Sequence, residues 1–114
     1  MIVNNLSFGS ITIDDETYLK DIIIDNGQVG RRKKGESKKY RDRFGHTPLS
    51  TGENIPWNCK RIIIGLGHSS SLPVMDEVYD MATLKGVEIT VMSTPEAIRL
   101  INEPDTNLIL HMTC

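Results

Sequence analysis

The sequence has 114 residues, of which 39% are hydrophobic and 25% charged, and its formal net charge is −2. These values are typical of one small globular domain, and no apolar run approaches the roughly 20 residues of a membrane-spanning helix. The first residues lack the basic-then-apolar order of a signal peptide, and two cysteines without an export signal indicate reduced thiols and a cytoplasmic location. We therefore expect a single domain over residues 1–114.

The first third of the chain predicts antiparallel strands. Residues 10–13 alternate polar and apolar side chains, and residues 14–16 supply a turn before an extended run at 17–25. Asn26 and Gly27 then predict a hairpin, since both accept the positive φ angles of a tight type I′ turn. A further strand resumes at residue 28.

A basic segment follows this hairpin. Residues 31–43 hold eight of the thirteen basic residues and two acids, a net charge of +6 that leaves −8 for the rest of the chain. Arg31, Arg32, Lys33 and Lys34 form the candidate basic patch. It is either a solvated loop or the site of an anionic partner. Residues 34–60 predict mostly loop with a short helical turn, anchored by Trp57.

The second half predicts a β-α-β-α-β unit. Residues 62–64 are a β-branched run typical of a strand covered on both faces. We expect a helix to begin at Pro73 and to end at Gly86, a second strand at 87–92, a helix with Thr94 as its N-cap, and a last strand at 108–112. The fold class is therefore α/β, with a small parallel unit joined to an antiparallel portion.

A glycine and serine loop follows the strand at 62–64. Gly65 and Gly67 fit the start of a dinucleotide-binding fingerprint, but its third glycine is replaced by Ser70 and the next strand ends without the acid that holds a ribose. This excludes NAD, and we expect no cofactor. A small-anion site remains, built from the following residues: Gly65, Gly67, His68, Ser69, Ser70, Ser71 and Thr94. The alternative is that the glycines only allow a turn and a serine only caps the helix.

His111 and Cys114 are the candidate catalytic pair, because a thiolate beside an imidazole is an activated nucleophile. Residues three apart on a strand point to opposite faces, so the chain must bend to bring this pair together. The alternatives are a hydrogen-bonded histidine and a small buried thiol. The histidines and cysteines are too scattered in sequence to predict a metal site.

His46 follows the basic segment and is either an exposed loop residue or a member of an anion site with Arg31 and Arg32. Nucleic-acid binding would use residues 31–43, with Tyr40 and Phe44 interleaved for stacking. The acidic remainder of the chain disfavours a long phosphate backbone but allows a short anionic ligand.

Six short motifs of the sequence occur together in one known family. They are Phe8-Gly-Ser-Ile-Thr-Ile, Asp21-Ile-Ile-Ile, Arg31-Arg-Lys, Ile62-Ile-Ile-Gly-Leu-Gly before Leu72-Pro, Ser93-Thr-Pro-Glu-Ala, and Leu110-His-Met-Thr-Cys. With these motifs the chain resembles the small α/β domain family that includes the adipogenesis-associated protein and a mitochondrial complex I assembly factor. It is most similar to the microbial branch of that family, over about residues 6–114. It departs from many relatives by having serines at 69–71 where they carry another glycine.

The resemblance implies a three-layer fold with a central mixed sheet, no established reaction, and action through other proteins. The first hypothesis is thus a non-enzymatic accessory, assembly or binding protein with an anion pocket at residues 65–71. A small enzyme that uses Cys114 or His111 is the alternative, and nucleic-acid binding through residues 31–43 is the second alternative. We expect a protein partner or a small anionic ligand, and no membrane.

Overall fold

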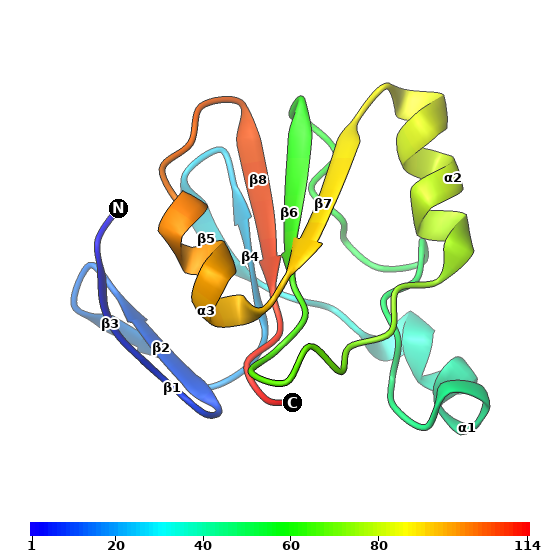
Figure 1. The fold of residues 1–114 in the computed structure, drawn as a ribbon, viewed down its shortest axis with the longest axis horizontal. Coiled ribbons are helices and arrows are strands. Elements are labelled where there is room, and N and C mark those ends of the chain that lie inside the picture. The colour runs from blue at the N-terminus through cyan, green and yellow to red at the C-terminus, as the bar shows by residue number, and fades with distance from the viewer.

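The computed structural model describes residues 1–114, which form two β-sheets and a few short helices (Figure 1). The strands are β1 (Val3–Ser7), β2 (Ser10–Ile13), β3 (Glu16–Tyr18), β4 (Ile22–Asp25), β5 (Gln28–Arg31), β6 (Arg61–Gly65), β7 (Glu88–Met92) and β8 (Thr106–Leu110). The helices are the 3₁₀ helix η1 (Gly35–Tyr40), α1 (Arg41–Phe44), α2 (Asp76–Lys85), α3 (Thr94–Ala97) and the 3₁₀ helix η2 (Ile98–Leu100). No helix is both long and apolar enough to cross a membrane.

The larger sheet is mixed and has the strand order β5-β4-β8-β6-β7. Strand β6 pairs in parallel with β7 and β8, and β4 runs antiparallel to both β5 and β8. Strands β1–β3 form a separate antiparallel sheet. The predicted α/β class with an added antiparallel portion is therefore confirmed. The predicted hairpin is confirmed as well, since Asn26 and Gly27 have φ angles of 50° and 79°.

Two hydrophobic cores lie on opposite faces of the mixed sheet, because successive residues of a strand face opposite sides. Ile63 packs with β2 and α3 on one face. Ile62 and Ile64 pack on the other face with Val78 of α2 and with Leu49, and Trp57 packs against this second core as an anchor. Figure 1 shows the resulting layers, with the small sheet and α3 on one side of the mixed sheet and α2 on the other.

The single strand predicted at 17–25 is wrong. The chain forms β3 in the small sheet and β4 in the mixed sheet, with Leu19 and Lys20 exposed between them. This break is what carries the chain from one layer to the next. It also leaves Asp21, directly before β4, beside the end of β8, where it accepts a hydrogen bond of 2.8 Å from the main chain of Met112.

Two predicted helix starts are also wrong. Helix α2 begins at Asp76 rather than Pro73, because the extended segment 73–75 exchanges main-chain hydrogen bonds with Leu49 on both sides of Val74. Helix α3 has Ser93 rather than Thr94 as its N-cap: the Ser93 hydroxyl accepts from the main chain of Glu96 and also donates to the Glu96 carboxylate. The predicted end of α2 is confirmed, with Gly86 at a φ of 67°.

Strand β8 ends at Leu110, so residues 111–114 form a separate segment that packs on the loop after β6. The main-chain N–H of His68 donates to the carbonyl of Thr113 at 2.8 Å, and those of Ser69 and Ser71 donate to the carbonyl of Cys114 at 3.0 and 2.9 Å. A Cβ atom on Gly67 would lie 2.3 Å from the carbonyl carbon of Cys114, so only glycine allows this close approach.

We predict that Gly67→Ala destabilises the protein more than Gly9→Ala does. Both glycines have a positive φ, 102° and 85°, but a Cβ on Gly9 would meet nothing within 4 Å. The control Gly9→Ala should therefore lower the free energy of unfolding by only about 1 kcal/mol, the cost of a positive φ for alanine. Gly67→Ala should lower it by about 1–3 kcal/mol more, because its Cβ overlaps Cys114. Chemical denaturation measures the free energy of unfolding of both variants. Equal decreases would contradict the prediction, because they would show that segment 111–114 can move away from Gly67 without loss of stability.

Candidate functional site

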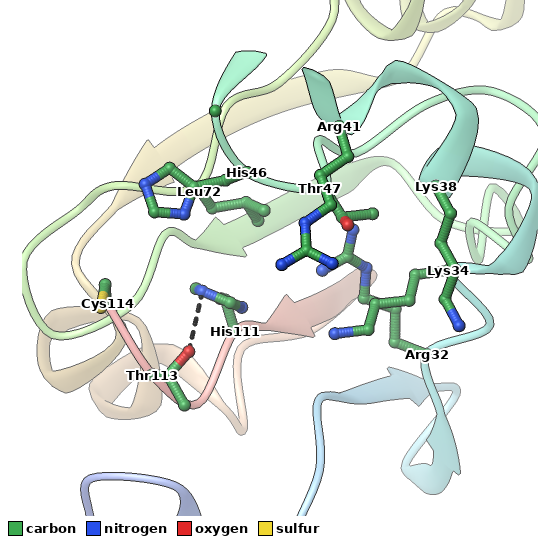
Figure 2. Close-up of a pocket in the computed structure, with 11 residues that line it drawn as sticks. Arg32, Lys34, Lys38, Arg41, His46, Thr47, Leu72, His111, Thr113 and Cys114 are labelled. Carbon is green, nitrogen blue, oxygen red and sulfur yellow. Dashed lines mark hydrogen bonds between the residues drawn. The ribbon is translucent and has the colours of Figure 1, made fainter. Parts of the chain in front are cut away.

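A cavity of about 550 Å³ lies between the basic segment and residues 111–114. Its lining residues are Arg32, Lys34, Lys38, Arg41, Gly45, His46, Thr47, Leu72, His111, Thr113 and Cys114 (Figure 2). Most come from the region after β5, from η1, from α1 and the loop after it, and from the segment that follows β8; Leu72 comes from the loop between β6 and α2. The fold thus joins two regions that are about 70 residues apart in the sequence, which were separate candidates in the sequence analysis.

The cavity is strongly positive. Four of its eleven lining residues are Lys or Arg, two more are histidines, and none is an acid. Lys34, Lys38 and Arg41 are exposed and form no ion pair and no side-chain hydrogen bond within the protein. Three cations without an anionic partner therefore surround a space that a small anion fits.

A second cavity of about 550 Å³ adjoins the first and shares Arg32, Lys34, Lys38, His111 and Thr113 with it. Its other lining residues include Lys20, Arg31 and Lys33. All four residues of the predicted basic patch therefore line one or both cavities. His46 and Arg32 share the first cavity, whereas Arg31 lies only in the second.

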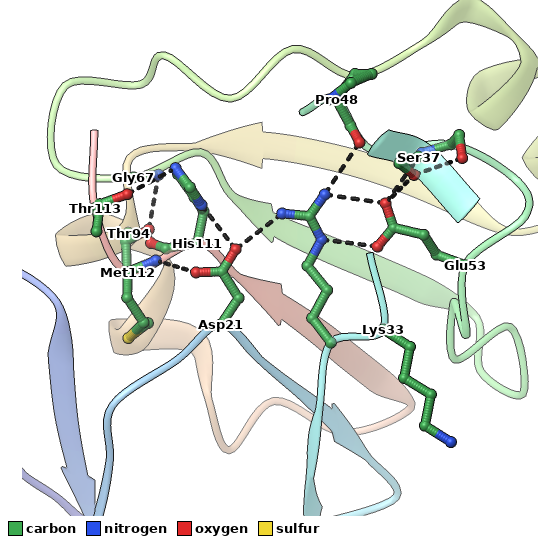
Figure 3. Close-up of polar contacts among 12 residues, drawn as sticks. Asp21, Lys33, Ser37, Pro48, Glu53, Gly67, Thr94, His111, Met112 and Thr113 are labelled. Carbon is green, nitrogen blue, oxygen red and sulfur yellow. Dashed lines mark hydrogen bonds and ion pairs between the residues drawn. The ribbon is translucent and has the colours of Figure 1, made fainter. Parts of the chain in front are cut away.

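Arg32 differs from these cations because it is buried, with its side chain 1% exposed. Its Nε and Nη2 donate to the two carboxylate oxygens of Glu53 at 2.7 and 3.0 Å, its Nη1 to Asp21 at 2.8 Å, and its Nη2 also to the carbonyl of Pro48 at 3.1 Å (Figure 3). Glu53 accepts a further hydrogen bond from Ser37 in η1. Arg32 thus fixes η1 and the 48–53 loop to the mixed sheet and satisfies two buried carboxylates.

Asp21 connects this guanidinium to His111. Its Oδ2 lies 2.8 Å from His111 Nδ1, and His111 Nε2 lies 3.3 Å from the Thr113 hydroxyl. Burial raises the pKa of Asp21, but the hydrogen bond and charge of His111 and the hydrogen bonds from Met112 and Arg32 outweigh burial and hold the pKa at about 2. Asp21 is therefore ionised at neutral pH, and it orients the imidazole ring.

The glycine and serine loop lies outside both cavities. The main-chain N–H groups of residues 67–69 and 71 donate to the chain's own oxygens, namely those of Thr94, Thr113 and Cys114. Thr94 is buried, and its hydroxyl accepts from Gly67 at 2.9 Å and donates to the carbonyl of His111 at 2.6 Å. The donors that were expected to hold an anion therefore hold segment 111–114 in place. The geometry favours the cavity over the loop as the anion site.

The remaining candidates take different positions. His68 packs on Phe8, with ring centroids 5.6 Å apart, and its buried Nε2 has no hydrogen-bond partner. Cys114 is exposed at the wall of the first cavity, but no hydrogen bond joins its thiol to His111. Cys59 lies elsewhere, and partial burial raises the pKa of its thiol. No group of three or more His, Cys, Asp and Glu side chains is placed to hold a metal ion.

Sequence analysis did not single out seven residues of this site: Asp21, Lys38, Arg41, Gly45, Thr47, Leu72 and Thr113. Lys38 and Arg41 belong to the basic segment 31–43, so the charge pattern was the signal that could have found them. Asp21 was predicted to be part of a strand. Thr113 lies between His111 and Cys114, the candidate catalytic pair. Asp21 and Thr113 both lie in motifs that carry the family resemblance, Asp21-Ile-Ile-Ile and Leu110-His-Met-Thr-Cys, but no local pattern assigns either residue to a site.

Comparison with known proteins supports the fold. A model of the family described as a protein of unknown function (DUF498/DUF598) matches residues 3–104. A conserved hypothetical protein from Pyrococcus horikoshii has a TM-score of 0.83 and 24% identity over 100% of both chains. The solved protein MT938 has a TM-score of 0.71 and 25% identity over 99% of this chain and 98% of its own. An outer membrane protein from Bartonella henselae has a TM-score of 0.67 and 14% identity over 98% of this chain and 94% of its own. The curated proteins contain no match.

We predict that Arg32→Met lowers the free energy of unfolding by about 3–5 kcal/mol, because it leaves the buried carboxylate of Glu53 without a counter-charge and leaves His111 as the only ion-pair partner of Asp21. The matched control is Lys33→Met. The Lys33 side chain is exposed and makes no ion pair, so we expect a change within about 0.5 kcal/mol. Urea denaturation at pH 7 compares the two variants. Equal effects would mean that Arg32 does not hold the network together.

The low pKa of Asp21 predicts a defined loss of stability in acid. The folded-state pKa of about 2 lies below the ordinary value of 3.8, so the contribution is present above about pH 4 and is lost as the pH falls through 2. The stability difference between the wild type and Asp21→Asn should therefore shrink by about 2 kcal/mol between pH 5 and pH 2. The exposed Asp80→Asn serves as the control and should show no such change. A pH-independent difference for Asp21→Asn would contradict the prediction.

Proposed function

The chain belongs to the DUF498/DUF598 family of proteins of unknown function, and we propose that it binds a small anion in the cavity between the basic segment and residues 111–114. The observation that carries this proposal is the set of three cations, Lys34, Lys38 and Arg41, which line the cavity without any anionic partner. Like charges held together repel one another unless a bound anion compensates them.

The surrounding structure suits a ligand of this kind. The carboxylates of Asp21 and Glu53 are both paired with Arg32, so their oxygens are directed at its guanidinium rather than at Lys34, Lys38 and Arg41; the cluster of three charges sums to −1, against +3 for the exposed cations. Thr47 and Thr113 add hydroxyl groups to the wall, and His46 and His111 add ring nitrogens. A phosphate or carboxylate would find both charges and hydrogen-bond donors there.

A small ligand fits better than a nucleic acid. The two cavities are concave and adjoining, whereas single-stranded nucleic acids are usually bound along an extended groove with stacking aromatic side chains. Tyr40 and Phe44, the aromatic residues of the segment, line neither cavity. The family is described as of unknown function and a structural neighbour as a hypothetical protein, so the accessory or assembly role implied by the resemblance stays a prediction.

Calorimetric titration with inorganic phosphate and pyrophosphate tests the proposal. The double substitution Lys34→Gln with Arg41→Gln should weaken binding by about tenfold or more, which corresponds to about 1.4 kcal/mol. The control is Lys39→Gln with Arg43→Gln, which removes the same charge from the same segment but from residues outside both cavities. It should change the affinity much less.

Three outcomes would count against the proposal. The first is that the wild type binds neither phosphate nor pyrophosphate. The second is that both double variants lose the same affinity, which would indicate only a general effect of charge. The third is tighter binding of a single-stranded oligonucleotide than of pyrophosphate, with a steep salt dependence, which would favour the nucleic-acid alternative.

A further inference from the structure

Three side chains at the shared wall of the two cavities form a chain of hydrogen bonds, with Asp21 Oδ2 2.8 Å from His111 Nδ1 and His111 Nε2 3.3 Å from Thr113 Oγ1. A carboxylate can only accept, so Nδ1 carries the proton of the neutral ring. In that tautomer Nε2 is the acceptor for the Thr113 hydroxyl, and Figure 3 draws this contact. A hydroxyl, a base and an acid that orients the base are the arrangement of an activated nucleophile.

The main chain holds this arrangement in place. The carbonyl of His111 accepts from Thr94, the N–H of Met112 donates to Asp21, and the carbonyl of Thr113 accepts from His68. The base and the hydroxyl therefore lie on a segment whose position is fixed before any ligand binds. Such preorganisation is what a catalytic group needs.

The charges of the cavity suit a reaction that develops an oxyanion. Figure 2 shows the charged ends of Lys34 and Arg41 extending toward His111. Cations aimed at a reacting carbonyl stabilise the negative charge of its tetrahedral intermediate. These cations and Thr113 line one cavity of about 550 Å³. A ligand that places its anionic group at the cations and its carbonyl at Thr113 must therefore carry the two groups only a few bonds apart.

Resting on the anion binding proposed above, we infer that Thr113, His111 and Asp21 hydrolyse a short ester whose acyl half carries a carboxylate. Thr113 Oγ1 attacks the ester carbonyl and its proton passes to His111 Nε2. The bond to the leaving oxygen breaks, and that oxygen takes the proton from His111, which releases the alcohol. Water then attacks the acyl-threonine, gives a proton to His111 that returns to Thr113 Oγ1, and releases the dicarboxylic acid.

The experiment uses p-nitrophenyl hydrogen succinate as the substrate and follows the release of nitrophenolate by the full-length protein. We expect many turnovers per chain, and a loss of about 100-fold or more in Thr113→Val and in His111→Gln. Both variants keep Lys34, Lys38 and Arg41, so in calorimetry they should lose less affinity for succinate than Lys34→Gln with Arg41→Gln does. Thr83→Val, the same change on the exposed face of α2, should keep full activity. The uncharged methyl p-nitrophenyl succinate should be a poorer substrate by about tenfold or more.

The outcomes separate the two proposals. If succinate and phosphate bind but the ester is not turned over, the hydrolysis is wrong and the anion binding stands. If no anion binds and no ester is turned over, both are wrong. Activity that survives in Thr113→Val but is lost in Cys114→Ser would overturn the role of Thr113 in favour of the thiol. A succinyl adduct on Thr113, detected by mass spectrometry after rapid quenching, is the result that supports it directly.

Discussion

The buried guanidinium of Arg32 is the interaction on which the site depends. It lies directly after β5 and ties together Asp21 before β4, Glu53 in the 48–53 loop and, through Glu53, the 3₁₀ helix η1. Desolvating one cation and two carboxylates is expensive, and only their mutual contacts offset that cost. The same contacts shape the electrostatics of the cavity, because they direct both carboxylates at Arg32 and leave the exposed lysines and arginine without an anionic partner.

A second constraint acts through the main chain. The loop after β6 presents a row of main-chain N–H groups at the carboxyl ends of the parallel strands, where many α/β proteins bind phosphate. Here those groups bind the carbonyls of Thr113 and Cys114 instead. Gly67 makes the approach possible, since any side chain there would overlap the segment. The loop thus serves the site by holding the residues that line it.

Several local signals in the sequence predicted local structure correctly, although the starts of α2 and α3 and the break between β3 and β4 were not among them. The covered strand at 62–64, the hairpin at Asn26 and the end of α2 at Gly86 each depend on a few neighbouring residues. The site depends on distant partners: Thr94 bonds to Gly67 and His111, which are 27 and 17 residues away. The cavity exists because the segment after β8 lies beside the segment after β5, and that proximity follows from strand order rather than from any motif.

The position of β8 also sets the order in which the chain can fold. This last strand lies between β4 and β6, and Ile22 pairs with Leu110 across nearly the whole sequence. During synthesis the β4–β5 hairpin and the β6–β7 pair emerge first, but nothing joins them until residues 106–110 leave the ribosome. The mixed sheet therefore closes only when residues 106–110 are available to pair with both neighbours, and such non-local pairing favours slow folding.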